Sequence, residues 1–305
     1  MIPLASAIEE FLIDQQVRGN SPKTVLYYRR VLGFFSSFAG DPQLDGVSLA
    51  MCKAYYLHLA RQDVTSTTVQ TYIRGLRAFL TWCFNEGYTE ENIPARFKLP
   101  RAQKKTIDVL TDAELRQLLA CFDTGSPLGA RNYAICALML DSGLRLNEVV
   151  TLPISGVHVI DGYAVVDGKG SKQRVVPLGQ ASRQALSRYL GKLPAAGPRL
   201  FVKVDGAPLK QSTVKQLFRD LKVRAGIPRL HPHLLRHSFA TRYLQNGGDI
   251  YSLQQILGHT SLEMVRRYVH LASSRTVEAF PRFSPLDNLE NPRQEPRSDS
   301  PPQVW

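Results

Sequence analysis

The chain of 305 residues has few cysteines and no paired cysteine motif. Its four cysteines, Cys52, Cys83, Cys121 and Cys136, stand singly in apolar stretches typical of helices, and no CxxC pair occurs. A zinc knuckle or a disulfide framework would need paired or regularly spaced thiols. The cysteines are therefore expected to be structural thiols in a reducing cytoplasm.

Long apolar runs are also missing. The first residues, MIPLASAIEEFL, lack the basic start and extended apolar core of a secretory signal peptide. No stretch elsewhere is long and apolar enough to span a bilayer. These absences predict a cytoplasmic protein without a membrane partner.

Acidic residues are in the minority, with 26 Asp and Glu against 38 Lys and Arg, which gives a formal net charge of +12. The excess is concentrated in residues 108–283, which hold 23 basic and 13 acidic residues. Residues 1–107 hold 13 and 9, and residues 284–305 hold 2 and 4. A basic surplus of this size favours a polyanionic partner and says nothing about the fold.

The length and the changes in composition predict two domains. Residues 1–90 are expected to form a helical domain, and the basic, proline-containing residues 91–108 a linker. Residues 109–283 would form the second domain. The last 22 residues, 284–305, are rich in proline and poor in apolar pattern, so a disordered tail is expected.

Local patterns predict a mainly α fold with a small antiparallel β-sheet. Ser21 and Pro22 are typical of a helix start, and Thr111 with Glu114 has capping-box spacing. The aromatic stripe Tyr72, Phe79 and Trp82 is expected to belong to a core. Strands are expected in the β-branched runs 156–161, 163–168 and 173–178, because each alternates with period two between turn residues. Helical patterns resume after Pro177.

Residues 231–237, HPHLLRH, concentrate three histidines and an arginine. Pro232 favours a helix start, so His233 and Arg236 would share one face near a helix N-terminus, a suitable place for a phosphate. His237 would point elsewhere and pack. A zinc site at His231 and His233 is the alternative. It would need further ligands, for which only His259 lies near in sequence, so neither a metal nor another cofactor is expected.

Four further residues have ordinary explanations when taken singly. Arg145 in SGLRLNE would pair with Glu148 three residues later, and Lys169 in the turn GKGSK would be solvated. His259 and Tyr268 lie nine residues apart in LGHTSLEMVRRY. Together, in this order, they match one family.

The chain resembles the tyrosine recombinases, or phage integrase family, from about residue 5 to residue 280. Its length is similar to that of the short Xer-like members. The segments that carry the resemblance are SPKTVLYYRRVLGFF, SGLRLNEV, GKGSKQRVVPL, HPHLLRHSFAT and LGHTSLEMVRRY. The resemblance implies a catalytic set consisting of Arg145, Lys169, His233, Arg236, His259 and Tyr268. Lys172 in the same turn is the alternative proton donor, whereas Tyr243 and Tyr251 lack the family's spacing after LGH.

The resemblance also implies a mechanism. Tyr268 would attack a DNA phosphate while arginines stabilise the added charge, His233 would act as base, and Lys169 would protonate the leaving 5′ oxygen. Strand exchange would pass through a 3′-phosphotyrosine and a Holliday junction without metal or ATP. Four protomers would assemble on two duplex DNA sites, each docking its segment 271–283 on a neighbour. The competing interpretations are a type IB topoisomerase and a non-catalytic DNA-binding regulator.

Overall fold

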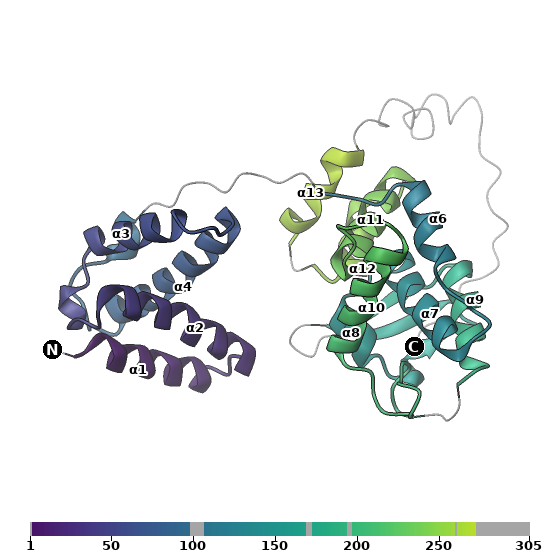
Figure 1. The fold of residues 1–305 in the computed structure, drawn as a ribbon, viewed down its shortest axis with the longest axis horizontal. Coiled ribbons are helices and arrows are strands. Elements are labelled where there is room, and N and C mark those ends of the chain that lie inside the picture. Colours follow the sequence, from purple (N-terminus) through teal and green to yellow (C-terminus); the bar gives the residue numbers. More distant parts are fainter. Residues whose placement is uncertain (1, 98–106, 169–172, 194–196, 260, 273–305) are drawn as a thin grey trace. The chain divides into compact units, whose positions relative to one another are not determined.

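The computed structural model describes residues 2–97, 107–168, 173–193, 197–259 and 261–272 (Figure 1). The chain divides into two compact units, Met1–Lys105 and Thr106–Trp305, and each has its own hydrophobic core. Residues 98–106 of the expected linker, the turn with Lys169 and Lys172, and the expected tail lie outside the described residues. No helix of the described ranges is long and apolar enough to cross a membrane.

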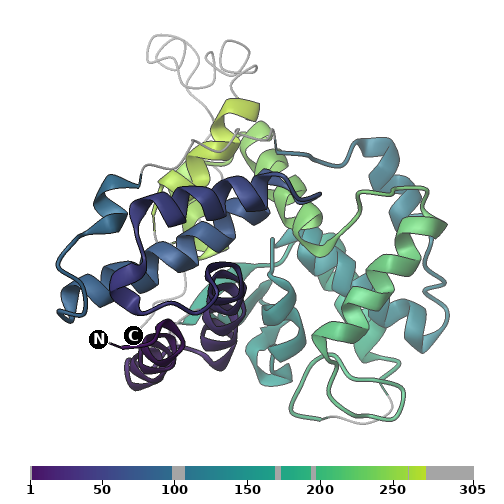
Figure 2. The ribbon, with the colours of Figure 1, turned by 60° about the vertical axis from the view of Figure 1, so that its left-hand side comes forward.

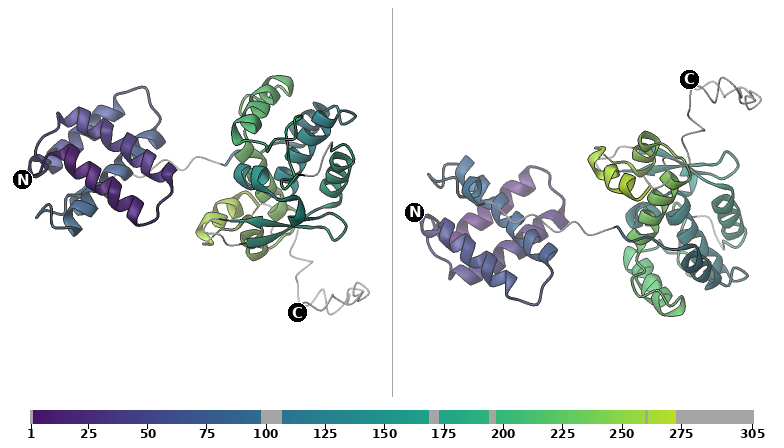
Figure 3. Two further views of the ribbon diagram at one scale, coloured as in Figure 1. Left: turned by 90° about the horizontal axis from the view of Figure 1, so that it is seen from below. Right: turned by 90° about the horizontal axis from the view of Figure 1, so that it is seen from above.

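The first unit is helical, as predicted (Figures 1 and 3). Its elements are α1 (Leu4–Val17), α2 (Pro22–Ala39), the 3₁₀ turn η1 (Leu44–Gly46), α3 (Leu49–Ala60), α4 (Ser66–Asn85) and the short α5 (Ile93–Arg96). The Ser21 side chain accepts a hydrogen bond from the backbone N–H of Thr24, which confirms the predicted start of α2. Side-chain capping satisfies an N–H that has no partner within the helix.

The core of the first unit is aromatic. The ring of Phe11 on α1 meets Tyr28, Phe79 and Trp82 edge-on, with centroids 5.0, 5.6 and 5.5 Å apart. Phe79 is fully buried and Trp82 is nearly so, while Tyr72 packs half-buried at the edge of this core. Edge-to-face contacts of this kind are the preferred geometry of aromatic pairs. The predicted core role of the aromatic stripe is thus confirmed.

The second unit combines helices with one three-stranded sheet. Its helices are α6 (Asp112–Ala120), α7 (Pro127–Asp141), α8 (Leu146–Thr151), α9 (Gln180–Leu190), α10 (Gln211–Arg224), α11 (Pro232–Gln245), α12 (Ile250–Leu257) and α13 (Glu263–Ala272), with a 3₁₀ turn η2 (Ile154–Gly156). Thr111 and Glu114 form the predicted capping box at the start of α6. The mainly α fold with a small antiparallel sheet is confirmed.

The sheet has the order β1 (Val157–His158), β2 (Tyr163–Asp167), β3 (Gln173–Pro177), with both pairings antiparallel (Figure 3). Val166 on β2 and Val176 on β3 are buried on its inner face. Arg174 lies opposite Val166 in the register and shares the face of Val176, because side chains alternate along a strand. An arginine therefore points inward from β3, whose strand packs against α12.

Helix α11 is the element that connects the site to the core. It packs against α7, α12 and α13, and its ribbon lies beside that of α13 in Figures 1 and 2. Leu234, Leu235 and Ala240 bury its inner side. The hydroxyl of buried Ser238 also accepts a hydrogen bond from the backbone N–H of Leu110 at 2.8 Å. These contacts hold the HPHLLRH segment in one position.

Candidate active site

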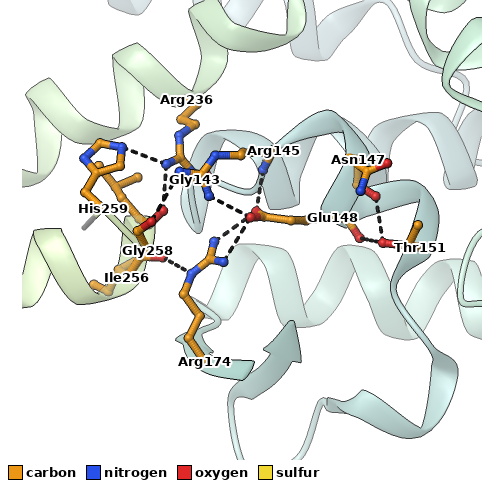
Figure 4. Close-up of polar contacts among 11 residues, drawn as sticks. Gly143, Arg145, Asn147, Glu148, Thr151, Arg174, Arg236, Ile256, Gly258 and His259 are labelled. Atoms are coloured by element: carbon orange, nitrogen blue, oxygen red, sulfur yellow. Dashed lines mark hydrogen bonds and ion pairs between the residues drawn. The ribbon is translucent and has the colours of Figure 1, made fainter. Parts of the chain in front are cut away.

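Three arginines from three elements converge on the C-terminal end of α12 (Figure 4). Arg174 Nε donates to the carbonyl of Ile256 at 2.7 Å, and Arg236 Nη2 to that of Leu257 at 2.7 Å. Arg145 Nη2 reaches the carbonyl of Gly258 at 3.4 Å. The last carbonyls of a helix lack intrahelical partners and carry partial negative charge, so they are natural acceptors for cations. The end of α12 thus fixes three guanidinium groups near each other.

Glu148 on α8 ties two of these arginines together. Its carboxylate accepts from Arg145 Nη1 at 2.8 Å and from Arg174 Nη1 and Nη2, both at 2.9 Å. It also accepts from the backbone N–H of Arg145 at 2.8 Å, as a capping-box glutamate does. The predicted pair of Arg145 and Glu148 is confirmed, and Arg174 joins it.

The carboxylate of Glu148 is charged despite its depth. Burial alone would raise its pKa, but the hydrogen bonds from Arg174 and from the Arg145 backbone, with the charge of Arg174, lower the pKa below its usual range. One carboxylate against the three guanidinium groups of Arg145, Arg174 and Arg236 leaves this cluster with a surplus of positive charge. Such a surplus can hold an anion.

Gly258 allows the close approach of Arg174. Its backbone lies in the left-handed region, with φ +61°, where it ends α12. A Cβ added there would lie 3.0 Å from Cδ and 3.1 Å from Nε of Arg174. Sequence reasoning identified LGH through the family pattern but overlooked Arg174. The period-two pattern of β3 contained a signal, because an arginine at an inward-facing strand position needs a buried partner.

Arg236 is the most buried of the three arginines, with 4% relative exposure. Besides the carbonyl of Leu257, it donates to the carbonyl of Gly143 at 2.5 Å and contacts His259 Nε2 at 3.0 Å. Burial, followed by the charge of Arg145, lowers the pKa of Arg236 to about 10, so it remains protonated at neutral pH. Because a guanidinium only donates, Nε2 of His259 is the acceptor in this contact.

His233 lies one turn before Arg236 on α11, as the spacing predicted. His233 and Arg236 share one face of α11, and the charges of Arg236 and Arg145 both act on the ring. His231 has a different role: its Nδ1 accepts from the backbone N–H of Leu234 at 3.1 Å and so caps α11. Within the described ranges, no three His, Cys, Asp or Glu side chains are grouped so that they could hold a metal ion.

The environment of His233 favours its neutral form. Partial desolvation of the ring, then the positive charges of His231, Arg236 and Arg145, lower the pKa of His233 below 6.5. The ring is therefore expected to be neutral at pH 7 and to gain its proton only as the pH falls through that lowered value. A histidine NMR titration of the free protein, with His233→Gln to assign the signal, measures this. A midpoint at or above 6.5 would contradict the prediction.

Gly143, in the turn between α7 and α8, is held in a tight place. Its φ is +63°, and an added Cβ would lie 2.5 Å from Cδ1 of Phe239 and 2.9 Å from Cδ2 of Leu257. We expect Gly143→Ala to destabilise the second unit by about 2–5 kcal/mol, from left-handed strain and overpacking together. Its displaced carbonyl would also weaken the contact with Arg236. Chemical denaturation followed by circular dichroism measures the effect.

Gly226 provides the matched control for this substitution. Its φ is also +63°, but an added Cβ would meet nothing within 4 Å. Gly226→Ala should therefore show only the backbone cost, about 1–2 kcal/mol. Equal losses in the two variants would mean that the contacts around Gly143 relax freely.

Tyr268 on α13 is 2% exposed, and its hydroxyl lies 2.7 Å from Nδ1 of His237. Helix α13 packs against α11, which carries Arg236, and against α12, whose last carbonyls hold the arginines, so Tyr268 lies on an element that adjoins the arginine cluster. His237 lies on a different side of α11 from His233 and Arg236, as expected, but the expectation that it simply packs is wrong, because its ring contacts the Tyr268 hydroxyl. His237 follows Arg236 on the helix, so its side chain points to a different side of α11, toward α13. The sequence alone did not show that α13 packs there.

The structure thus brings together Arg145, His233, Arg236, His259 and Tyr268 from the start of α8, from α11, from α13 and from the loop after α12. Lys169 and the alternative donor Lys172 lie outside the described residues. Tyr251 is 64% exposed on α12, and Tyr243 packs its ring on Phe239 with centroids 5.8 Å apart. Clustered guanidinium groups can hold a phosphate, and a nearby phenol can attack it.

Profiles of known families match both units. The phage integrase family matches residues 108–275, and the phage integrase N-terminal SAM-like domain matches residues 8–87. The two matches follow one another along the chain and cover most of its described residues.

Relatives match over almost the full length. Tyrosine recombinase XerC of Bacillus pumilus is 32% identical over 289 residues, which are 90% of this chain and 95% of the relative. Tyrosine recombinase XerD of Staphylococcus aureus is 29% identical over 293 residues, 92% and 99% of the two chains. The fold is shared with a lambda integrase dimer bound to a COC′ core site, with a TM-score of 0.74, 19% identity and coverage of 88% and 95%.

Proposed function

The chain belongs to the phage integrase family and is a site-specific tyrosine recombinase, and from this premise we propose how its clustered side chains cut and rejoin duplex DNA. The proposed catalytic set is Arg145, Lys169, His233, Arg236, His259 and Tyr268. The observation that supports it most is the convergence of Arg145 and Arg236 on neighbouring carbonyls at the end of α12, against which the helix of Tyr268, α13, packs.

The arginines would bind the scissile phosphate. Attack on phosphorus spreads additional negative charge over the non-bridging oxygens, and fixed donors aimed at these oxygens lower the barrier. Arg145 keeps 32% of its side chain exposed, so a ligand can reach its guanidinium, while Arg236 provides a buried, immobile charge beneath. His259 and neutral His233 would complete the set of groups around the phosphate oxygens.

The chemistry exchanges one phosphoester for another. The hydroxyl of Tyr268 gives its proton to a base, its oxygen bonds to phosphorus, the bond from phosphorus to the 5′ oxygen breaks, and Lys169 gives that oxygen a proton. The protein is then joined to a 3′ phosphate, and the free 5′ hydroxyl of a second strand reverses the reaction. Because the phosphotyrosine retains the energy of the cleaved bond, the exchange needs neither ATP nor a divalent ion.

The partners follow from the same proposal. The substrate would be a double-stranded recombination site; the lambda integrase dimer, which shares the fold, is bound to a core site. Four copies, identical or paired with a homologous recombinase, would assemble on two sites and exchange strands through a Holliday junction. Segment 271–283 would dock on the neighbouring copy. The protein would act in the cytoplasm, at the nucleoid.

Capture of the covalent intermediate tests this function. The purified chain is incubated with sheared chromosomal DNA in EDTA without ATP, and the protein-linked fragments are sequenced to find the site. We expect protein on the 3′ end and a 5′ hydroxyl that polynucleotide kinase can label. A plasmid carrying two copies of the site should then recombine. Relaxation of a plasmid that lacks the site, without recombination, would instead indicate a topoisomerase, and absence of adducts would indicate a DNA-binding regulator.

A further inference from the structure

We propose that His237 is a further catalytic residue, whose Nδ1 takes the proton of the Tyr268 hydroxyl as that oxygen attacks phosphorus. The inference rests on the proposed function, since it requires Tyr268 to be the nucleophile. It replaces His233 as the base, the role suggested by the family pattern, with the imidazole that lies against the reacting oxygen.

The geometry is that of a base and its nucleophile. Nδ1 of His237 lies 2.7 Å from the hydroxyl oxygen of Tyr268, within the range for direct proton transfer. The two rings are tilted by 44°, with centroids 5.7 Å apart, so they do not stack face to face, and the close contact is the one between nitrogen and hydroxyl. Tyr268 is 2% exposed, which limits competition from water for its proton.

The imidazole is also held in place by its helix. Its neighbours Arg236 and Ser238 are buried and anchored, the first to the carbonyls of Gly143 and Leu257 and the second to the N–H of Leu110. The backbone of His237 is therefore fixed between two anchored residues, and α11 packs directly against α13. Such anchoring gives a base the positional precision that catalysis requires.

A base is needed because the phenol is a weak acid. Its ordinary pKa is about 10, so little phenolate exists near neutrality. The O–H bond of Tyr268 breaks and an N–H bond forms on Nδ1, which gives an imidazolium next to the new phosphotyrosine. In the reverse step the imidazolium returns the proton as phosphorus leaves the phenol oxygen. Lys169 donates a proton to the 5′ oxygen during cleavage and takes it back during rejoining. The phenol proton and the 5′ hydroxyl proton are thus transferred by different residues.

His233 is suited to a different task. It is exposed, and the charges that act on it come from His231, Arg236 and Arg145. This position, beside the two phosphate-binding arginines, suits a contact with the phosphate oxygens. The two histidines of HPHLLRH that face the reaction would then divide the work, one toward the phosphate and one toward the nucleophile.

The variant His237→Asn separates proton transfer from hydrogen bonding. The amide of Asn can occupy the region of Nδ1 and bond to the phenol, but it cannot take a proton. We expect DNA binding close to that of the unmodified protein and single-turnover cleavage of a nicked site slower by about 10²–10⁴-fold. The matched control is His231→Asn, because Asn is a preferred helix N-cap and can accept a hydrogen bond from the backbone N–H that His231 caps at the start of α11. It should cleave at the normal rate.

A more acidic nucleophile gives the decisive measurement. A fluorinated tyrosine at position 268 ionises more readily, so it should restore much of the cleavage lost in His237→Asn. It should restore none of the cleavage lost in His233→Asn. For each histidine variant, the cleavage rate with fluorinated tyrosine is divided by the rate with ordinary tyrosine at position 268. A loss of folded protein caused by the histidine substitution affects both rates and therefore cancels.

A 5′-bridging phosphorothiolate substrate completes the test. Its sulfur leaves without a proton, so it should rescue Lys169→Ala and leave the defect of His237→Asn unchanged. Unchanged or faster cleavage by His237→Asn, or a defect that the fluorinated tyrosine fails to relieve, would overturn the inference while leaving Tyr268 as nucleophile. If Tyr268 is not the nucleophile, the covalent adduct will still form in Tyr268→Phe, so a failure of the proposed function is seen in a separate experiment.

Discussion

Tyr268→Phe is expected to bind its DNA site normally and to form no detectable covalent adduct. The substitution removes only the hydroxyl, which is the proposed nucleophile and the group in contact with His237. The ring stays apolar in a site where it is 2% exposed, so the fold should lose about 0.5–1.5 kcal/mol for one hydrogen bond. Binding is measured by gel shift, and the adduct by denaturing electrophoresis of a nicked substrate that traps the cleaved state.

Two other tyrosines of the region serve as controls. Tyr251→Phe changes an exposed residue of α12, and Tyr243→Phe a ring that packs on Phe239. Both variants should form the adduct at the normal rate. An adduct that survives in Tyr268→Phe and disappears in either control would move the nucleophile to that residue.

Local rules account for the parts of the fold that the sequence predicted. Ser21 and Thr111 cap their helices because short side-chain oxygens can satisfy free N–H groups of the first turn. The strands that contain Val166 and Val176 were readable from alternation, since one face of the sheet is buried. In each case the information lies within a few neighbouring residues.

The proposed site can be read from the sequence in part, and for a different reason. Arg145, His233, Arg236, His259 and Tyr268 are proposed from the order and spacing of family motifs, which no local rule supplies. Arg174 and His237 were missed because their partners, Glu148 and Tyr268, are 26 and 31 residues away. Only the packing of β3 against α12 and of α11 against α13 brings these pairs together. Tertiary contacts, and not propensity, decide such positions.

The three carbonyls at the end of α12 show the same limit. The sequence LGH contains the glycine that ends the helix, which a helix-stop rule identifies. No such rule states that Ile256, Leu257 and Gly258 each accept from a different arginine. The spacing of these carbonyls sets the spacing of the guanidinium groups, and therefore the place where a phosphate can bind.

Arg236→Lys is expected to slow cleavage by about 10²–10³-fold with little change in DNA binding, as for the loss of one oriented donor in a site that stabilises an oxyanion. The guanidinium now spans two carbonyls and the Nε2 of His259. A lysine retains the charge, but its donors radiate from a single nitrogen and cannot reach three separated acceptors. The site would therefore keep its attraction for DNA and lose the geometry that aims charge at the phosphate oxygens.

The neighbouring Arg242 distinguishes this effect from a general loss of arginine on α11. Arg242 donates to Asp112 and, at 2.8 Å, to the carbonyl of Leu110, so it anchors α11 to the start of α6 without touching the site. Arg242→Lys should lower the melting temperature slightly and leave single-turnover cleavage unchanged. Equal losses of cleavage in both variants would mean that the position of α11 limits the reaction. A loss in Arg236→Lys only would show that the planar guanidinium of Arg236 is required, because both variants keep the positive charge.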